Sequence, residues 1–335
     1  MWLTICGLAA VLVMGGSAFA QEVVSVKAGM VHYVEGKVFL DNSAVRIKAA
    51  SAQFPDMKNG GILRTELGRA EVLLSPGMFL RMGEDTTVRM ISNSLEDTRI
   101  ELVQGVALLE VDELAKENIL SIAVKESSIT PMRSGLYKID AEEAELRVFD
   151  GRADVLSNDK KIEARKGTVV KLDGTLVTAK FDPEKGDTLY RWSNRRAAQL
   201  AMASVSSARS IGKTGLKRSD WAWNPYYGLY TFIPGRGTIM SPFGYPYYSP
   251  QTVYVVYRQP SSGGGGGGGV NSGSSSPSYN PNLGYSPTSS RSYDGNVGYT
   301  APSSAPAAAA SAPAASPRAA ETSAPRGSDG GGRAK

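Results

Sequence analysis

The chain has 335 residues, enough for one to three domains of ordinary size, but its composition is uneven. It contains one His and one Cys, so multi-histidine metal sites, zinc ribbons, disulfide frameworks and Cys–His catalytic dyads are excluded by number alone. The net charge of +5 conceals an uneven distribution of charge along the chain. Residues 21–182 carry 22 basic and 26 acidic side chains, whereas residues 183–335 carry 15 and 6. We expect no metal, no cofactor and no enzymatic activity.

The first 20 residues form an apolar run without charged side chains, which ends in Ala18-Phe19-Ala20. Small residues at Ala18 and Ala20 are typical of a signal-peptidase site, so we predict a secretory signal at 1–20. The alternative is an uncleaved anchor, since about 20 apolar residues can span a bilayer. We expect a periplasmic or secreted protein, or one anchored in the inner membrane if the segment is not cleaved.

Export makes nucleic acid an unsuitable partner for the basic C-terminal half. We expect this half to meet anionic envelope polymers, lipid headgroups or an acidic protein face, and the alternative is that its charge serves solubility alone.

Short apolar alternations separated by glycine and polar turns fill residues 23–181, which indicates many short strands. Met78, Leu80 and Met82, for example, alternate with Phe79 and Arg81. Residues 100–103 and 146–149 repeat this period of two, and each such segment reads as a half-buried strand. The pattern predicts an all-β domain over residues 21–182, either a β-sandwich or a short β-helical stack.

A small motif recurs at Gly36, Gly105 and Gly151, where an acidic or amide residue precedes glycine between two strand-like runs. This motif suits a tight hairpin turn with positive φ. The intervals between the three glycines are unequal, so the domain is not a regular solenoid.

An ordered series of motifs in this region resembles the FecR domain. The motifs lie at residues 29–38, 61–65, 68–74, 99–105, 135–140 and 148–153. The resemblance implies an all-β extracytoplasmic module, whose best-understood relatives pass a signal from an outer-membrane receptor across the inner membrane to a sigma factor. Those relatives carry a cytoplasmic sigma-binding segment ahead of a membrane span. Because the apolar run begins here at the second residue, we expect an exported FecR-like protein without that segment.

A basic amphipathic helix is predicted within residues 183–212. Leu189, Trp192 and Leu200 fall near one face, and Arg195 and Arg196 lie elsewhere on its surface. Such a helix packs its apolar stripe on a neighbouring sheet or, alternatively, lies on a membrane.

The segment 213–260 is rich in Tyr, Pro and Gly, and residues 221–257 hold twelve of the chain's 27 aromatic side chains. Aromatic rings with polar edges suit sugar faces, proline-rich peptides and protein interfaces. The predicted contact residues are Trp221, Trp223, Tyr226, Tyr227, Tyr230, Tyr245, Tyr247, Tyr248, Arg195 and Arg196. The alternative is that these rings belong to extra strands that cap the domain.

Residues 261–335 consist largely of Gly, Ser, Pro and Ala, which predicts a disordered, low-complexity spacer. Our leading hypothesis is a non-enzymatic binding or scaffold module of the cell envelope, in contact with an envelope protein or with peptidoglycan or another glycan. One alternative is a signalling component that senses an envelope protein in the manner of FecR-type regulators. Another is a carbohydrate-active enzyme, since Asp140, Glu142, Glu143 and Glu145 could supply two carboxylates.

Overall fold

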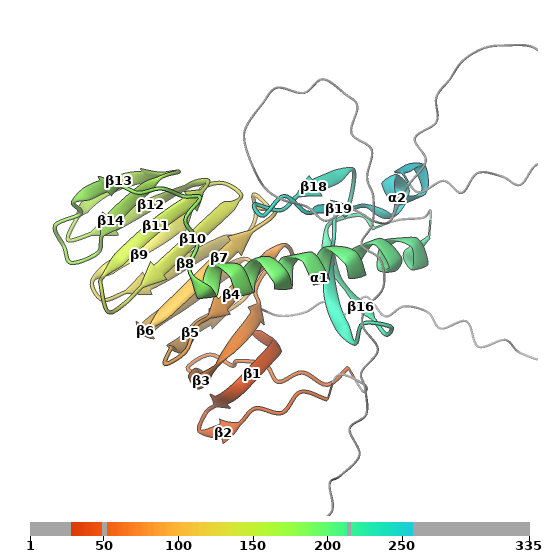
Figure 1. The fold of residues 1–335 in the computed structure, drawn as a ribbon, viewed down its shortest axis with the longest axis horizontal. Helices are drawn as coiled ribbons and strands as arrows, with labels where there is room; N and C mark the ends of the chain where they lie inside the picture. The colour runs from red at the N-terminus through yellow and green to blue at the C-terminus, as the bar shows by residue number, and fades with distance from the viewer. Residues whose placement is uncertain (1–27, 49–51, 213–215, 257–335) are drawn as a thin grey trace, which may run out of the picture. The chain divides into compact units, whose positions relative to one another are not determined.

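The computed structural model describes residues 28–48, 52–212 and 216–256 (Figure 1). The predicted signal segment with Ala18 and Ala20, and the predicted spacer at 261–335, lie outside these residues. The described residues are mostly β-structure with one long helix, which confirms the predicted all-β class. They belong to one compact unit.

A long antiparallel pair opens the main sheet. β1 (Met30–Leu40) runs beside β3 (Ile62–Leu73) along nearly its whole length, and β2 (Ser43–Ala44) folds back onto the end of β1. The other edge of β3 is shared between two strands, because residues 62–64 pair with β5 and residues 70–73 pair with β4. β3 is therefore the point at which the sheet divides into two branches.

The two branches face each other as a sandwich. The first branch has the order β5 (Thr87–Asn93), β6 (Asp97–Gln104), β8 (Ile119–Val124), β9 (Ser127–Pro131), β12 (Arg152–Ser157), β13 (Lys160–Arg165). The second has the order β4 (Met78–Met82), β7 (Val106–Val111), β10 (Gly135–Asp140), β11 (Glu145–Asp150), β14 (Thr168–Lys171), β15 (Thr178–Lys180). Alternate side chains from both branches, such as Val88, Ile122, Leu109 and Val148, meet in one shared core.

The three glycine turns adopt the expected positive φ, but the predicted hairpins are wrong. Gly105 joins β6 to β7 and Gly151 joins β11 to β12, and in both cases the two strands belong to different branches. Each turn is therefore a crossover between the layers of the sandwich. Gly36 lies inside β1 opposite Gly68, where a Cβ would stand 2.1 Å from the carbonyl oxygen of Leu67.

The outer face of the second branch is apolar and covered. Phe79, Leu108, Leu136 and Phe149 project from it, so β4 is buried on both faces rather than half-buried as its alternation suggested. Helix α1 (Thr188–Ile211) lies across this face (Figure 1). The helix begins at Asp187, whose side chain accepts the backbone N–H of Tyr190 at 2.9 Å, as helix N-caps do.

The chain after α1 packs onto the same side of the sandwich. It forms an antiparallel hairpin of β16 (Asp220–Asn224) and β17 (Leu229–Ile233), then the short pair β18 (Thr238–Met240) and β19 (Pro246–Tyr248), and finally α2 (Pro250–Val256). The helix α1 contacts β16, β17 and β19. Neither α1 nor α2, the helices of the described residues, has the length and apolarity to cross a membrane.

Candidate functional site

The predicted aromatic contact residues divide into a buried set and an exposed set. Trp221 and Tyr247 have no exposed surface, and Tyr230 is buried beside them. The Trp221 ring lies edge-on to Phe79 of β4, with ring centroids 5.1 Å apart. These rings join the C-terminal strands to the outer face of the second branch, and a partner cannot reach them in this structure.

The exposed set lies at the tip of the β16–β17 hairpin. Tyr226 is 86% exposed and Tyr227 is 44% exposed, and their rings touch edge to face with centroids 5.0 Å apart. The side-chain oxygen of Asn224 accepts the backbone N–H groups of both tyrosines at 3.1 Å. The amide nitrogen of Asn224 in turn donates to the carbonyl oxygen of Ala203 on α1 at 2.9 Å. The tip is therefore fastened to the body of the protein.

The remaining predicted residues fall between these extremes. Trp223, Tyr245 and Tyr248 are half-buried, and the Tyr245 hydroxyl donates to the side-chain oxygen of Asn194 at 2.5 Å. Arg195 is exposed on α1, whereas its neighbour Arg196 is 5% exposed and points into the protein. The two arginines therefore do not form one basic surface.

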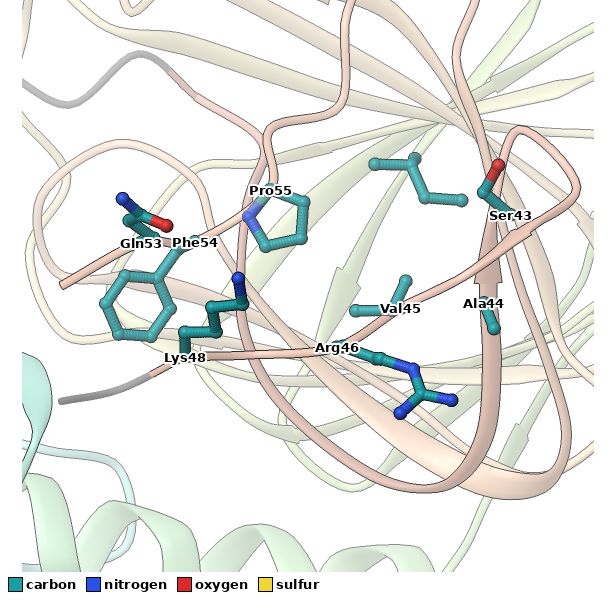
Figure 2. A pocket seen from close by; sticks show the side chains of 9 residues that line it. Ser43, Ala44, Val45, Arg46, Lys48, Gln53, Phe54 and Pro55 are labelled. Carbon is teal, nitrogen blue, oxygen red and sulfur yellow. The ribbon is translucent and has the colours of Figure 1, made fainter. Parts of the chain in front are cut away.

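A pocket of about 380 Å³ lies beside the hairpin, between the β1–β2 turn and the segment 52–55 (Figure 2). Its lining is Leu40, Ser43, Ala44, Val45, Arg46, Lys48, Gln53, Phe54 and Pro55. The Phe54 ring connects it to the aromatic set, because it meets Trp223 and Tyr230 edge-on at 5.8 Å and 5.5 Å. The pocket thus combines apolar and cationic side chains, and Phe54 links it to Trp223 and Tyr230 of the β16–β17 hairpin.

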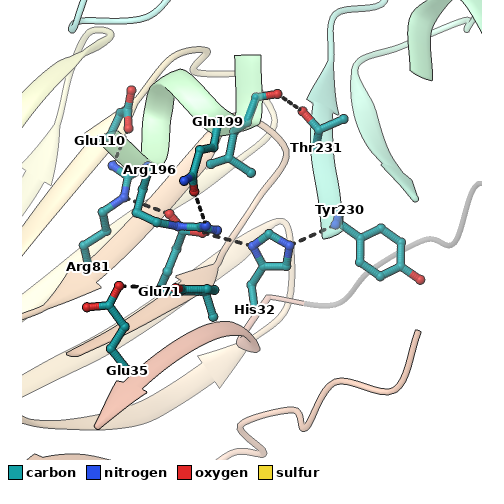
Figure 3. Close-up of polar contacts among 11 residues, drawn as sticks. His32, Glu35, Glu71, Arg81, Glu110, Arg196, Gln199, Tyr230 and Thr231 are labelled. Carbon is teal, nitrogen blue, oxygen red and sulfur yellow. Dashed lines mark hydrogen bonds and ion pairs between the residues drawn. The ribbon is translucent and has the colours of Figure 1, made fainter. Parts of the chain in front are cut away.

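A buried charged cluster lies under α1, and we call it the Glu71 network (Figure 3). Its members are His32, Glu71, Arg81, Glu110, Asp112 and Arg196. Glu71 on β3 accepts from Arg81 Nε of β4 at 2.8 Å, from Arg196 Nη2 of α1 at 2.8 Å and from His32 Nδ1 of β1 at 3.0 Å. Arg81 also donates to Glu110 of β7. The Glu71 carboxylate on β3 therefore links β1 and β4 to helix α1.

The hydrogen bonds fix the tautomer of His32. Its Nε2 accepts the backbone N–H of Tyr230 at 2.9 Å, so the proton sits on Nδ1 and points at Glu71. Burial lowers the pKa of His32, which keeps the ring neutral. Burial opposes ionisation of Glu71 as well, but Arg196 and Arg81 outweigh it and hold the pKa of that carboxyl well below its usual range.

A proton on Asp112 balances the charge of the rest of the network. Burial, together with the neighbouring Glu110 carboxylate, raises the pKa of Asp112 well above its usual range. Burial raises the pKa of Glu110 as well, but the direct contact with Arg81 opposes this, so Asp112 is the carboxyl that keeps the proton. Two arginines then face two carboxylates, and His32 and Asp112 are neutral. Buried charges are tolerated in proteins when they are paired in this way.

The Glu71 network is a connection inside the protein, because every one of its side chains is buried. It attaches β17 to β1 and attaches α1 to β3, and through Arg81 it extends to β4 of the second branch. Sequence reasoning placed Arg196 on a contact surface. It missed Glu71, Arg81 and Glu110, although a charged residue inside an otherwise apolar strand such as β4 is a signal of buried pairing.

The acidic segment between β10 and β11 makes turn contacts. The Asp140 carboxylate accepts the backbone N–H groups of Glu142 and Glu143 at 3.0 Å and 2.9 Å. Glu145 pairs with Arg147 at 2.9 Å and with Lys171 at 2.8 Å. Across residues 28–48, 52–212 and 216–256, no group of His, Cys, Asp and Glu is arranged to hold a metal ion.

Comparison with known proteins gives one family match. Residues 62–169 match the family described as FecR protein. Two crystal structures described as "a putative anti-sigma factor from Parabacteroides distasonis ATCC 8503" are each 14% identical to the chain, with TM-scores of 0.33 and 0.32. The matches cover 37% and 36% of this chain and 61% and 60% of theirs, so the chain spans less than two thirds of these relatives. Among curated proteins the comparison finds no match.

Proposed function

We propose that the chain is a non-enzymatic regulatory protein that acts by binding another protein of the cell envelope, because residues 62–169 match the family described as FecR protein. The contact surface is the tip of the β16–β17 hairpin together with the pocket beside Phe54. In this proposal the sandwich is a support, and the C-terminal strands present the binding residues.

The observation that best supports this proposal is the pair of exposed tyrosine rings at the tip of the β16–β17 hairpin. Tyr226 and Tyr227 bring a large apolar area to the surface, while Asn224 holds their backbone in place. Tyrosine is enriched at binding hot spots because it offers area and a polar edge at a low cost in side-chain entropy. A fastened loop also loses less freedom on binding than a mobile one.

The neighbouring pocket indicates the chemistry of the partner. Leu40, Val45 and Phe54 offer an apolar lining, and Arg46 and Lys48 add positive charge. The complementary ligand is a protein segment with an apolar or aromatic residue flanked by acidic side chains. Such recognition fits the predicted exported location, and it serves an envelope scaffold and a receptor-sensing regulator equally well.

The test is site-specific photo-crosslinking in the intact cell envelope. A photoreactive phenylalanine analogue replaces Tyr226 in the full chain, and the matched control carries it at Leu156, which is 49% exposed on the outer face of β12. The proposal predicts a discrete protein adduct at position 226, identifiable by mass spectrometry, and no adduct at 156. Equal adducts at both positions, no adduct at either, or attachment of position 226 only to peptidoglycan would contradict it.

A further inference from the structure

Three crossovers between the two layers meet at one end of the sandwich. They are the connections from β9 to β10, from β11 to β12 and from β13 to β14 (Figure 1). A pocket of about 500 Å³ lies among them, lined by Arg133, Ser134, Asp150, Gly151, Arg152, Arg165 and Lys166. Each crossover thus contributes at least one cationic side chain. This place is distinct from the hairpin and from the Glu71 network.

The backbone around this pocket is held firmly. The hydroxyl of buried Tyr137 accepts the backbone N–H of Arg152 at 3.0 Å and donates to the carbonyl oxygen of Arg133 at 2.7 Å. Gly151 has a φ of +89°, and a Cβ there would stand 2.4 Å from the Tyr137 hydroxyl. The first two crossovers are therefore packed in direct contact, which fixes the spacing of their backbones at Arg133 and Arg152.

The charges of the pocket are only partly neutralised. Lys166 pairs with Asp150 at 3.2 Å, and Glu163 is shared between Arg152 at 3.2 Å and Arg165 at 2.5 Å. Four cations thus face two carboxylates. The exposed Arg133 side chain makes no hydrogen bond or ion pair with any described residue, and the buried Nε of Arg152 has no acceptor. The pocket therefore has a local excess of two positive charges, and the exposed Arg133 supplies unused donors.

We propose that this pocket binds a phosphate group. A phosphate monoester carries close to two negative charges at neutral pH, which matches the excess of positive charge. The planar guanidinium of arginine donates two parallel hydrogen bonds to phosphate oxygens, and Arg133 and Arg165 line this pocket from two different crossovers. The volume exceeds that of a lone phosphate, so the ligand is a phosphorylated small molecule or a phospholipid headgroup.

Titration calorimetry on the full chain tests the proposal with glycerol 3-phosphate as probe and glycerol as its uncharged control. We expect binding of the phosphate ester alone, weaker at high salt. Arg133→Ala should weaken it by about tenfold or more, since a charge-assisted hydrogen bond is lost, and Arg133→Lys should weaken it less. The matched control is Arg236→Ala, which removes an exposed arginine far along the chain and should leave binding unchanged.

Vesicles distinguish the two sources of phosphate. The ligand is a lipid headgroup if the full chain sediments with phosphatidylglycerol–phosphatidylcholine vesicles but not with vesicles of phosphatidylcholine alone. In that case Arg133→Ala should abolish the sedimentation. Binding of glycerol 3-phosphate without vesicle binding identifies a small ligand. Binding of neither probe overturns the proposal, and so does an equal loss in Arg133→Ala and Arg236→Ala. Both arginines are exposed, so unchanged unfolding midpoints should verify that the variants fold.

Discussion

Replacing Arg196 by alanine should weaken the attachment of α1 to the sandwich. Its Nη2 donates to Glu71 at 2.8 Å, its Nη1 donates to Gln199 at 2.7 Å, and its guanidinium lies 3.9 Å from the centre of the Tyr33 ring. Removing one partner of a buried ion pair costs about 3–5 kcal/mol. Glu71 keeps Arg81 and His32, so we expect the lower end of that range, about 3 kcal/mol of unfolding free energy.

The adjacent Arg195 supplies the control, because it is a surface residue of the same helix. Arg195→Ala should change the unfolding free energy by no more than about 0.5 kcal/mol. Urea denaturation followed by tryptophan fluorescence measures both variants, since Trp192 of α1 and Trp221 of β16 are buried at the interface. Equal stability of the two variants would refute the role that we assign to the Glu71 network.

Two further predictions concern buried groups. Asp112→Asn should flatten the dependence of stability on pH. In the wild type, the unfolded chain releases the Asp112 proton near its ordinary pKa of 3.8, whereas the folded protein keeps it. The stability of the wild type therefore falls as pH rises above that value. Denaturation at pH 5 and pH 8 measures this, and parallel profiles for both proteins would contradict it. Tyr137→Phe leaves the Arg152 N–H without its acceptor and should cost about 1–3 kcal/mol in thermal or urea unfolding, whereas Tyr227→Phe should be neutral. A neutral Tyr137→Phe would show that the hydroxyl does not hold the crossovers together.

The strands of the sandwich could be predicted because their signal is local. In β4, for example, Met78, Leu80 and Met82 alternate with Phe79 and Arg81, and a period of two is decided within a few residues. Whether both faces are buried depends on what packs against the outer face. That is determined by α1, which begins more than 100 residues later, so local alternation could not reveal it.

The glycine turns illustrate the same limit. Residue type predicted positive φ at Gly105 and Gly151, since an L side chain rarely adopts it. A turn motif does not say whether the following strand pairs with the preceding one or crosses to the opposite layer. The crossovers depend on the closure of the whole sandwich, and only the structure reveals them.

The candidate site was predictable in composition but not in arrangement. Clustering of aromatic residues identified the C-terminal segment, yet Trp221 and Tyr226 look alike in sequence and differ completely in exposure. Arg195 and Arg196 likewise differ only by the 100° that separates successive helix positions. The Glu71 network joins His32 to Tyr230 across 198 residues, a separation at which no sequence pattern operates.

The most direct test of the proposed function uses the partner protein that crosslinking at position 226 identifies. The affinity of this partner is measured for the purified full-length chain and for its variants. We predict that Tyr226→Ser with Tyr227→Ser weakens binding by about 30-fold or more, the loss typical of an interface hot spot, while Leu156→Ser has no effect. Unchanged affinity of the double variant, with folding intact, would contradict the claim that the fastened tyrosine pair is the contact surface.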